Sequence, residues 1–217
     1  MESYPGKSIV LEGHDGAGKS TQIAHICNRL ISLGQEVVVL EEPGSDDPTQ
    51  GIPIANELRR VIKDGNLRKD GYTNLLLFSA ARHELWRQAA EPALKLGKYV
   101  LSGRNWLSSI AYQGYGEGVG LDLIEQTTRA FTAPRYMEPD LTLILAFENK
   151  KERLERIARR GKTQETPDAF EKLGNDFQSK VQQAYVDIAE RYNYYTIDAQ
   201  QSPEAITEQI MAHIDKL

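Results

Sequence analysis

The chain has 217 residues, which at ~150 residues per domain corresponds to one large domain or two small ones. Its 26 Lys and Arg against 31 Asp and Glu give a formal net charge of −5, which argues against a general nucleic-acid or membrane-surface binder. With a single cysteine, Cys27, no visible signal peptide and no apolar run near the ~20 residues of a membrane span, we expect a cytoplasmic protein without a disulfide.

Short apolar runs alternate along the chain with longer stretches of helical periodicity. Strands are predicted at 8–12, 37–40, 99–101, 140–147 and 194–197. Helices are predicted at 19–33, 52–63, 73–96, 121–130, 150–160, 170–192 and 203–217, with Pro92 kinking or splitting the third and Gly174 breaking the sixth. Continuous apolar strands separated by helices are typical of a parallel sheet with helices on both faces. Because no linker divides the chain, we expect a single α/β domain over residues 1–217.

A phosphate-binding loop (P-loop) lies between the first predicted strand and the first predicted helix. Its residues fit the pattern G-x-x-x-x-G-K-[ST] and are Gly13, His14, Asp15, Gly16, Ala17, Gly18, Lys19, Ser20 and Thr21. Glycines let backbone N–H groups surround a phosphate, and the following helix adds its positive N-terminal end. Lys19 is predicted to reach the β- and γ-phosphates, and the Ser20 hydroxyl to coordinate Mg²⁺. The sequence therefore predicts a site for a nucleoside triphosphate.

Three classes of P-loop protein remain open: a small-molecule kinase, a GTPase and an ATPase motor. The segment 149–152 ends in Glu where guanine recognition needs Asp, and Asp140 begins its strand, whereas a motor needs an acidic residue at a strand's end. Arg104 follows the third strand, and ligands of parallel sheets bind at the carboxyl ends of strands. Together with Arg59 and Arg82 it could hold a second phosphate, because guanidinium groups bind phosphates bidentately. The pattern favours a kinase.

Several segments closely resemble the thymidylate kinase family, whose members phosphorylate dTMP with ATP. They are 9–22, 42–44, 76–82, 108–114, 139–142 and 197–199, so the resemblance covers nearly the whole chain. It implies the P-loop NTPase fold with five parallel strands in the order 2-3-1-4-5, and a lid segment at 161–171. It also implies Mg²⁺ as cofactor, ATP and dTMP as substrates, and a homodimer as a common state of the family.

The resemblance assigns a group of residues to the thymine base of the acceptor. Phe78 would stack on the ring, as an aromatic face can for any base. Arg82 would donate to a thymine carbonyl, and Ser109 and Gln113 would complete recognition with polar contacts. Pro43 would pack near the base.

A second group would hold the sugar and the phosphate of the acceptor. Tyr112 would crowd the 2′ position and favour deoxyribose, and Asp15 would reach the 3′-hydroxyl. Arg59 and Arg104 would hold the acceptor's phosphate. Glu42, in the proline turn after the second strand, belongs to the same acceptor site.

The sequence departs from the family pattern at the catalytic centre. Where bacterial-type members have Asp before the arginine that follows the third strand, this chain has Gly103. Glu41 stands where the family usually has Arg. The family supplies a catalytic arginine from the P-loop or the lid, but the corresponding positions here are Gly16 and Ala169.

These departures lead to two hypotheses about catalysis, which otherwise depends on Lys19 and Arg104. Arg159 or Arg160, just before the lid, would supply the missing cation, and Glu41 would take over the role of the family's Asp near Mg²⁺. Two alternatives to a dTMP kinase remain open. One is a related kinase for another deoxynucleotide, and the other is a weakly catalytic nucleotide-binding protein that acts through a partner.

Overall fold

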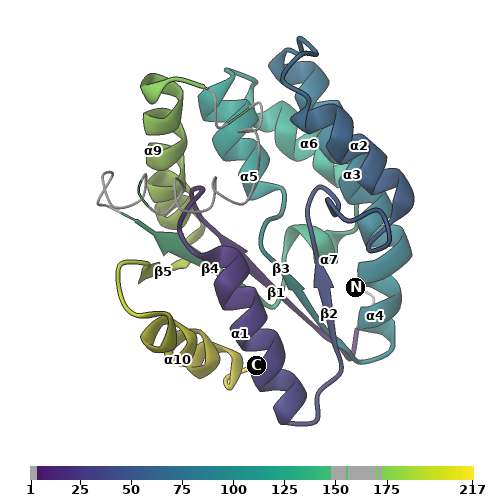
Figure 1. Cartoon of the computed structure of the whole chain (residues 1–217), viewed down its shortest axis with the longest axis vertical. Coiled ribbons are helices and arrows are strands. Elements are labelled where there is room, and N and C mark those ends of the chain that lie inside the picture. Colours follow the sequence, from purple (N-terminus) through teal and green to yellow (C-terminus); the bar gives the residue numbers. More distant parts are fainter. Residues whose placement is uncertain (1–3, 148–154, 156–169, 171–172) are drawn as a thin grey trace.

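The computed structural model describes residues 4–147, 155, 170 and 173–217, and within them a five-stranded parallel sheet forms the centre of the molecule (Figure 1). The strands are β1 (Lys7–Glu12), β2 (Val37–Leu40), β3 (Tyr99–Ser102), β4 (Leu141–Ala146) and β5 (Tyr195–Asp198). Their order is β2-β3-β1-β4-β5, and every neighbouring pair is parallel. The predicted fold and strand order are confirmed.

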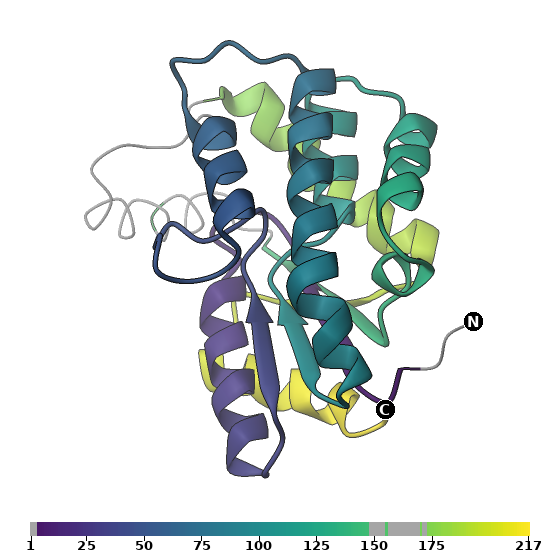
Figure 2. The same cartoon turned by 90° about the vertical axis from the view of Figure 1, so that its right-hand side faces the viewer.

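Helices cover both faces of the sheet (Figures 1 and 2). On one face lie α1 (Lys19–Ser32) and α10 (Pro203–Ile214). The other helices are α2 (Pro53–Lys63), α3 (Gly71–Leu85), α4 (Glu91–Lys95), α5 (Leu107–Ser109), α6 (Leu121–Phe131), α7 (Pro134–Met137) and α9 (Asn175–Tyr192), with π-helical segments at Trp86–Ala90 and Ile110–Gly116. None of the helices in the described ranges combines the length and the apolarity needed to cross a membrane.

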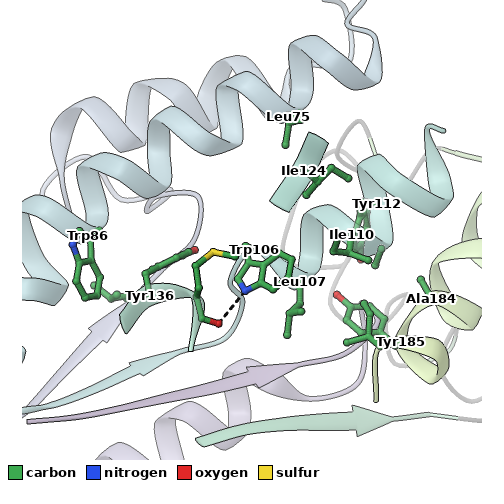
Figure 3. Packing of buried hydrophobic residues seen from close by; sticks show 14 of the residues in the cluster. Leu75, Trp86, Trp106, Leu107, Ile110, Tyr112, Ile124, Tyr136, Ala184 and Tyr185 are labelled. Atoms are coloured by element: carbon green, nitrogen blue, oxygen red, sulfur yellow. Dashed lines mark hydrogen bonds between the residues drawn. The ribbon is translucent and has the colours of Figure 1, made fainter. Parts of the chain in front are cut away.

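Each face of the sheet has its own hydrophobic core, because successive side chains of a strand point to opposite faces. Leu101 and Leu143 pack with α1 and α10, whereas Val100 and Ile144 belong to the larger core on the other face. In that larger core, Figure 3 shows Tyr112 and Tyr185 at one end and Trp86 and Tyr136 at the other. In the central strands β1, β3 and β4 both faces are buried, which explains why these strands lack a polar alternation.

The helix predicted at 73–96 begins earlier and is interrupted earlier than expected. The Asp70 carboxylate accepts a hydrogen bond from the Thr73 N–H at 2.7 Å, so this N-cap starts α3 at Gly71. The regular helix stops at Leu85, and the π-helical turn Trp86–Ala90 precedes Pro92. Proline lacks an N–H and its ring clashes with the carbonyl four residues earlier, so the interruption falls before it.

Two helical stretches were not predicted from the sequence, namely the short α7 and α5 with the π-helical segment that follows it. Both stretches are too short to show helical periodicity, and the π-helical segment after α5 also contains two glycines, which are unfavourable in a helix. Gly114 packs closely against the end of the Leu121 side chain, which would have to shift to make room for a Cβ at this position. The helix predicted at 170–192 begins at Asn175, with Gly174 at its N-cap as the expected break. The helix predicted at 150–160 and the lid at 161–171 lie outside the described residues, except for Glu155 and Phe170.

Candidate functional site

The P-loop joins the end of β1 to the start of α1. Gly16 and Gly18 adopt left-handed conformations with φ of 87° and 89°, which favour glycine, and a Cβ at Gly13 would collide with the Leu145 carbonyl. Lys19 is buried, and its Nζ donates to the carbonyl oxygens of Gly13 at 2.7 Å and His14 at 3.0 Å. The loop geometry therefore holds the lysine ammonium inside the loop, where a phosphate would compete with these two carbonyls.

A cavity of ≈ 260 Å³ adjoins the P-loop between the start of α1 and the start of α10. Its walls come from Gly16, Ala17, Gly18, Thr21, Gln22, Gln201, Pro203 and Ile206. Gln22 fastens the two helices together: its amide N–H donates to the Pro203 carbonyl at 2.9 Å, and its oxygen accepts from Thr207 at 2.8 Å. Because the cavity borders the loop glycines, it is the candidate site for the rest of the donor nucleotide.

Arg104, Asp15 and Tyr112 meet at the carboxyl end of β3. The Arg104 guanidinium forms an ion pair with Asp15, and the Tyr112 hydroxyl donates to the same carboxylate at 2.6 Å. Burial alone would raise the pKa of Asp15, but the charges of Arg104 and Lys19 outweigh it and hold that pKa well below its usual range. The sequence assigned all three residues to the acceptor site, and the structure brings them together beside the P-loop.

Glu12 was not assigned to the site in the sequence analysis, but its carboxylate connects the end of β1 to the start of α5 beside this cluster. It is fully buried at the end of β1 and accepts hydrogen bonds from the N–H groups of Asn105 at 2.7 Å and Ser108 at 3.1 Å. It also accepts from the hydroxyls of Ser108 and Tyr185, each at 2.9 Å. Ser108 in turn accepts from Arg104 at 2.8 Å. Glu12 therefore satisfies the free N–H groups where the chain enters α5 and indirectly supports Arg104.

A second buried cluster surrounds Arg82, which is 1% exposed. Its Nε donates to Glu42 at 3.0 Å, its Nη1 to the Ser109 hydroxyl at 2.8 Å and its Nη2 to the Asn105 carbonyl at 3.0 Å. Glu42 also accepts from the Tyr136 hydroxyl at 2.6 Å. A guanidinium has five N–H donors, and in the described part of the chain three of those of Arg82 donate to protein acceptors. The Glu42 carboxylate thus accepts hydrogen bonds from both Arg82 and Tyr136. The peptide bond between Glu42 and Pro43 is cis.

The other residues assigned to the base lie around this cluster. The Arg82 guanidinium lies over the Phe78 ring, 5.4 Å from its centroid, and Phe170 lies 6.0 Å from Phe78, centroid to centroid. Gln113 is buried, and its amide N–H donates to Glu117 at 3.0 Å. Phe78 is half-buried, so its ring borders the cluster without being enclosed by it.

Arg59 forms no hydrogen bond or ion pair with either cluster in the described part of the chain. It lies on α2 and forms a bidentate ion pair with Asp46, a residue of the loop between β2 and α2 that the sequence analysis did not single out. The proposed lid arginines, Arg159 and Arg160, and the departure at Ala169 lie outside the described residues.

A family model described as thymidylate kinase matches residues 11–210 of this chain. The chain belongs to the thymidylate kinase family. The thymidylate kinase of Deinococcus radiodurans is 35% identical to it, with 97% of both chains covered. That of Pelotomaculum thermopropionicum is 36% identical over 98% of this chain and 91% of its own, and that of Oceanobacillus iheyensis is 37% identical over 95% and 88%.

Within this thymidylate kinase fold, the two departures Glu41 and Gly103 are neighbours. Leu40 of β2 pairs with Ser102 of β3, so the residues that follow them leave the sheet side by side. Gly103 has space for a side chain: a Cβ there would lie 3.9 Å from the Lys19 Cβ, an ordinary contact. Glu41 is exposed, and its carboxylate has no hydrogen bond or ion pair within the described part of the chain.

Proposed function

We propose that this protein transfers the γ-phosphate of ATP to dTMP and releases dTDP and ADP. The observation that carries the proposal is the placement of Arg104 and Asp15 beside Lys19 of the P-loop, in a chain that matches the thymidylate kinase family over nearly its full length. Donor and acceptor sites are thereby adjacent, as in-line transfer between two phosphates requires. A cytoplasmic setting and a homodimer are carried over from the family as part of the proposal.

The proposed acceptor site uses the two clusters described above. Arg104, with Arg59, holds the acceptor's phosphate, and Asp15 receives the 3′-hydroxyl. Tyr112 disfavours a ribose; burial and the Asp15 carboxylate raise the pKa of its phenol well above the usual value, so it stays protonated. The base lies against Phe78, and Arg82 donates to one of its carbonyls. Pro43, Ser109 and Gln113 complete the surroundings of the base, and Glu42 holds Arg82 in place.

The proposed phosphoryl transfer needs positioning and charge compensation more than proton transfer. An oxygen of the acceptor's phosphate attacks the γ-phosphate, and no strong general base is required because that phosphate is already largely ionised. Lys19 balances the negative charge on the transferring group.

Mg²⁺ fits the donor set at the start of α1. Ser20 follows Lys19 in the first turn and is exposed there, and a hydroxyl together with phosphate oxygens makes a set of hard ligands suited to this cation. When bound, Mg²⁺ would neutralise phosphate charge. We propose that Ser20 is its protein ligand and that Glu41 lies close enough to hold its water shell, because position 41 lies beside position 103 and position 103 faces Lys19.

Glu41→Gln should raise the Mg²⁺ concentration needed for half-maximal turnover, because it removes the carboxylate proposed to hold the water shell. Adding Gly103→Asp should lower that requirement again, since the structure has room for the new side chain. Titration of Mg²⁺ in steady-state assays and in ATP-binding calorimetry measures both effects. An unchanged Mg²⁺ dependence in Glu41→Gln would refute this role.

Arg159→Ala or Arg160→Ala should lower turnover more than it weakens acceptor binding, if one of them supplies the cation that stabilises the transition state. Parallel measurements of kcat and of dTMP affinity separate the two effects. Full turnover in both single variants and in the double variant would mean that the cation comes from another residue, with Lys162 as the next candidate.

The acceptor assignment is tested by following ADP release with dTMP, dUMP, dGMP, dCMP and dAMP. We expect dTMP to give the highest kcat/KM, because the pocket around Phe78 and Arg82 is proposed to accept thymine. A preference for another monophosphate would replace the acceptor in the proposal. Absence of turnover with all five acceptors, despite ATP binding, would contradict it.

A further inference from the structure

The ion pair between Arg59 and Asp46 leaves one edge of the guanidinium unused. Arg59 Nε donates to Oδ1 of Asp46 and Nη2 donates to Oδ2, both at 2.7 Å, which is a bidentate contact along one side of the guanidinium plane. Within the described residues, Nη1 makes no hydrogen bond or ion pair. The Nη1–Nη2 edge therefore keeps its capacity to bind a second anion in the same bidentate way.

The partner carboxylate is more exposed than the arginine it holds. The Arg59 side chain is 16% exposed and the Asp46 side chain 55%. Lys63, one turn further along α2, also contacts Asp46, at 3.1 Å. Hydrogen bonds and charge from Arg59, with the charge of Lys63, hold the pKa of Asp46 well below its usual range, so the carboxylate is ionised at neutral pH.

The loop that carries Asp46 lies against the start of α2 and is held to that helix by hydrogen bonds. Figure 2 shows this loop between β2 and α2. Asn56 accepts from the Ser45 N–H at 2.7 Å and donates to the Gln50 carbonyl at 2.7 Å. Gly44 lies so close to the Ala55 backbone that a Cβ would collide with it. These contacts fix the loop on both sides of Asp46.

We propose that Asp46 is a positioning residue that fixes the plane of the Arg59 guanidinium and presents its Nη1–Nη2 edge to the phosphate of the acceptor. This inference rests on the proposed function, in which Arg59 binds that phosphate. A free arginine side chain loses rotamer freedom when it binds a ligand, and an arginine already held by a carboxylate loses less of it. Asp46 thus strengthens phosphate binding without touching the substrate.

The test compares dTMP with thymidine, which lacks the phosphate, by calorimetry on the full chain. Asp46→Asn keeps the shape of the side chain and removes its charge. We expect it to weaken dTMP binding by roughly 3- to 10-fold, the cost of ordering one long side chain, and to leave thymidine binding unchanged. In turnover assays the KM for dTMP should rise by a similar factor while the KM for ATP stays constant. Asp46→Glu, which retains the carboxylate, should restore part of the loss.

Asp47→Asn is the matched control. Asp47 is the next residue of the same loop, and its carboxylate accepts from Thr49 and Gln50 within the loop and makes no ion pair in the described structure. Asparagine can still accept from the Thr49 N–H, so the loop should keep its shape and dTMP binding should stay unchanged. The comparison separates loss of the Arg59 partner from loss of any carboxylate in the loop.

The other outcomes would overturn the inference. Equal weakening of dTMP and thymidine would mean that Asp46 only maintains the pocket, and tighter dTMP binding would mean that it competes with the phosphate for Arg59. Unchanged dTMP binding would mean that it has no role. Arg59→Ala shows which idea has failed: if this variant weakens dTMP selectively but Asp46→Asn does not, only the positioning role is wrong. If Arg59→Ala has no effect on dTMP, the acceptor-phosphate assignment is wrong as well.

Discussion

Lys19→Ala should reduce turnover by on the order of 10²- to 10³-fold, the usual cost of removing one group that stabilises transition-state charge. The Lys19 ammonium is buried inside the P-loop, within hydrogen-bonding distance of the Gly13 and His14 carbonyls, so it lies where a bound phosphate would sit. The fold should persist, because α1 is held by the core residues Ile23, Ile26 and Leu30.

Steady-state kinetics and thermal unfolding of the wild type and the Lys19→Ala variant measure these two effects separately. Lys98→Ala is a suitable control, since Lys98 lies at the opposite end of the sheet just before β3, in an ion pair with Glu36. Turnover of Lys19→Ala near that of the wild type would contradict the P-loop assignment.

Arg82→Met should destabilise the protein by about 3–5 kcal/mol, because it leaves the Glu42 carboxylate buried without its positive partner. Each side chain of this pair is 2% exposed, so water cannot replace the lost contact. For a chain of this size the loss corresponds to a fall in Tm of roughly 6–20 °C. Burial raises the pKa of Glu42, against the opposing effects of Arg82 and Tyr136, and without Arg82 it should rise further.

The double variant Arg82→Met with Glu42→Leu is the control for this prediction. Replacing both members of a buried ion pair with apolar side chains is often neutral or stabilising, so the double variant should recover part of the lost stability. The recovery is partial because Ser109, Tyr136 and the Asn105 carbonyl lose a hydrogen-bond partner. Urea unfolding of the wild type, the two single variants and the double variant gives the coupling free energy. If Arg82→Met lowers the free energy of unfolding by less than about 1 kcal/mol, the ion pair does not stabilise the fold as expected.

The parts of the site that could be predicted are those encoded by local sequence. The P-loop pattern and Arg104 at the end of a predicted strand depend on spacing along the chain, and the parallel sheet follows from alternating strands and helices. The strand order came from the family resemblance, and the structure has the same order.

The parts that could not be predicted depend on contacts between distant segments. Glu12, at the end of β1, accepts a hydrogen bond from the Asn105 N–H just before α5, although the two residues are 93 positions apart in the sequence. Tyr185 approaches Glu12 from α9, and the pairing of Arg59 with Asp46 depends on how the loop folds back on α2. No periodicity or motif marks these contacts. A buried carboxylate at a strand end next to a P-loop, such as Glu12, is the one signal that a sequence reading could have used.

The most direct test of the whole account is chromatographic measurement of the products formed from ATP, Mg²⁺ and dTMP by the purified full chain. The proposed function predicts that dTDP and ADP appear in equal amounts, and that Lys19→Ala, which should still fold, forms both much more slowly. ADP formation without dTDP, or at the same rate in the absence of dTMP, would contradict it.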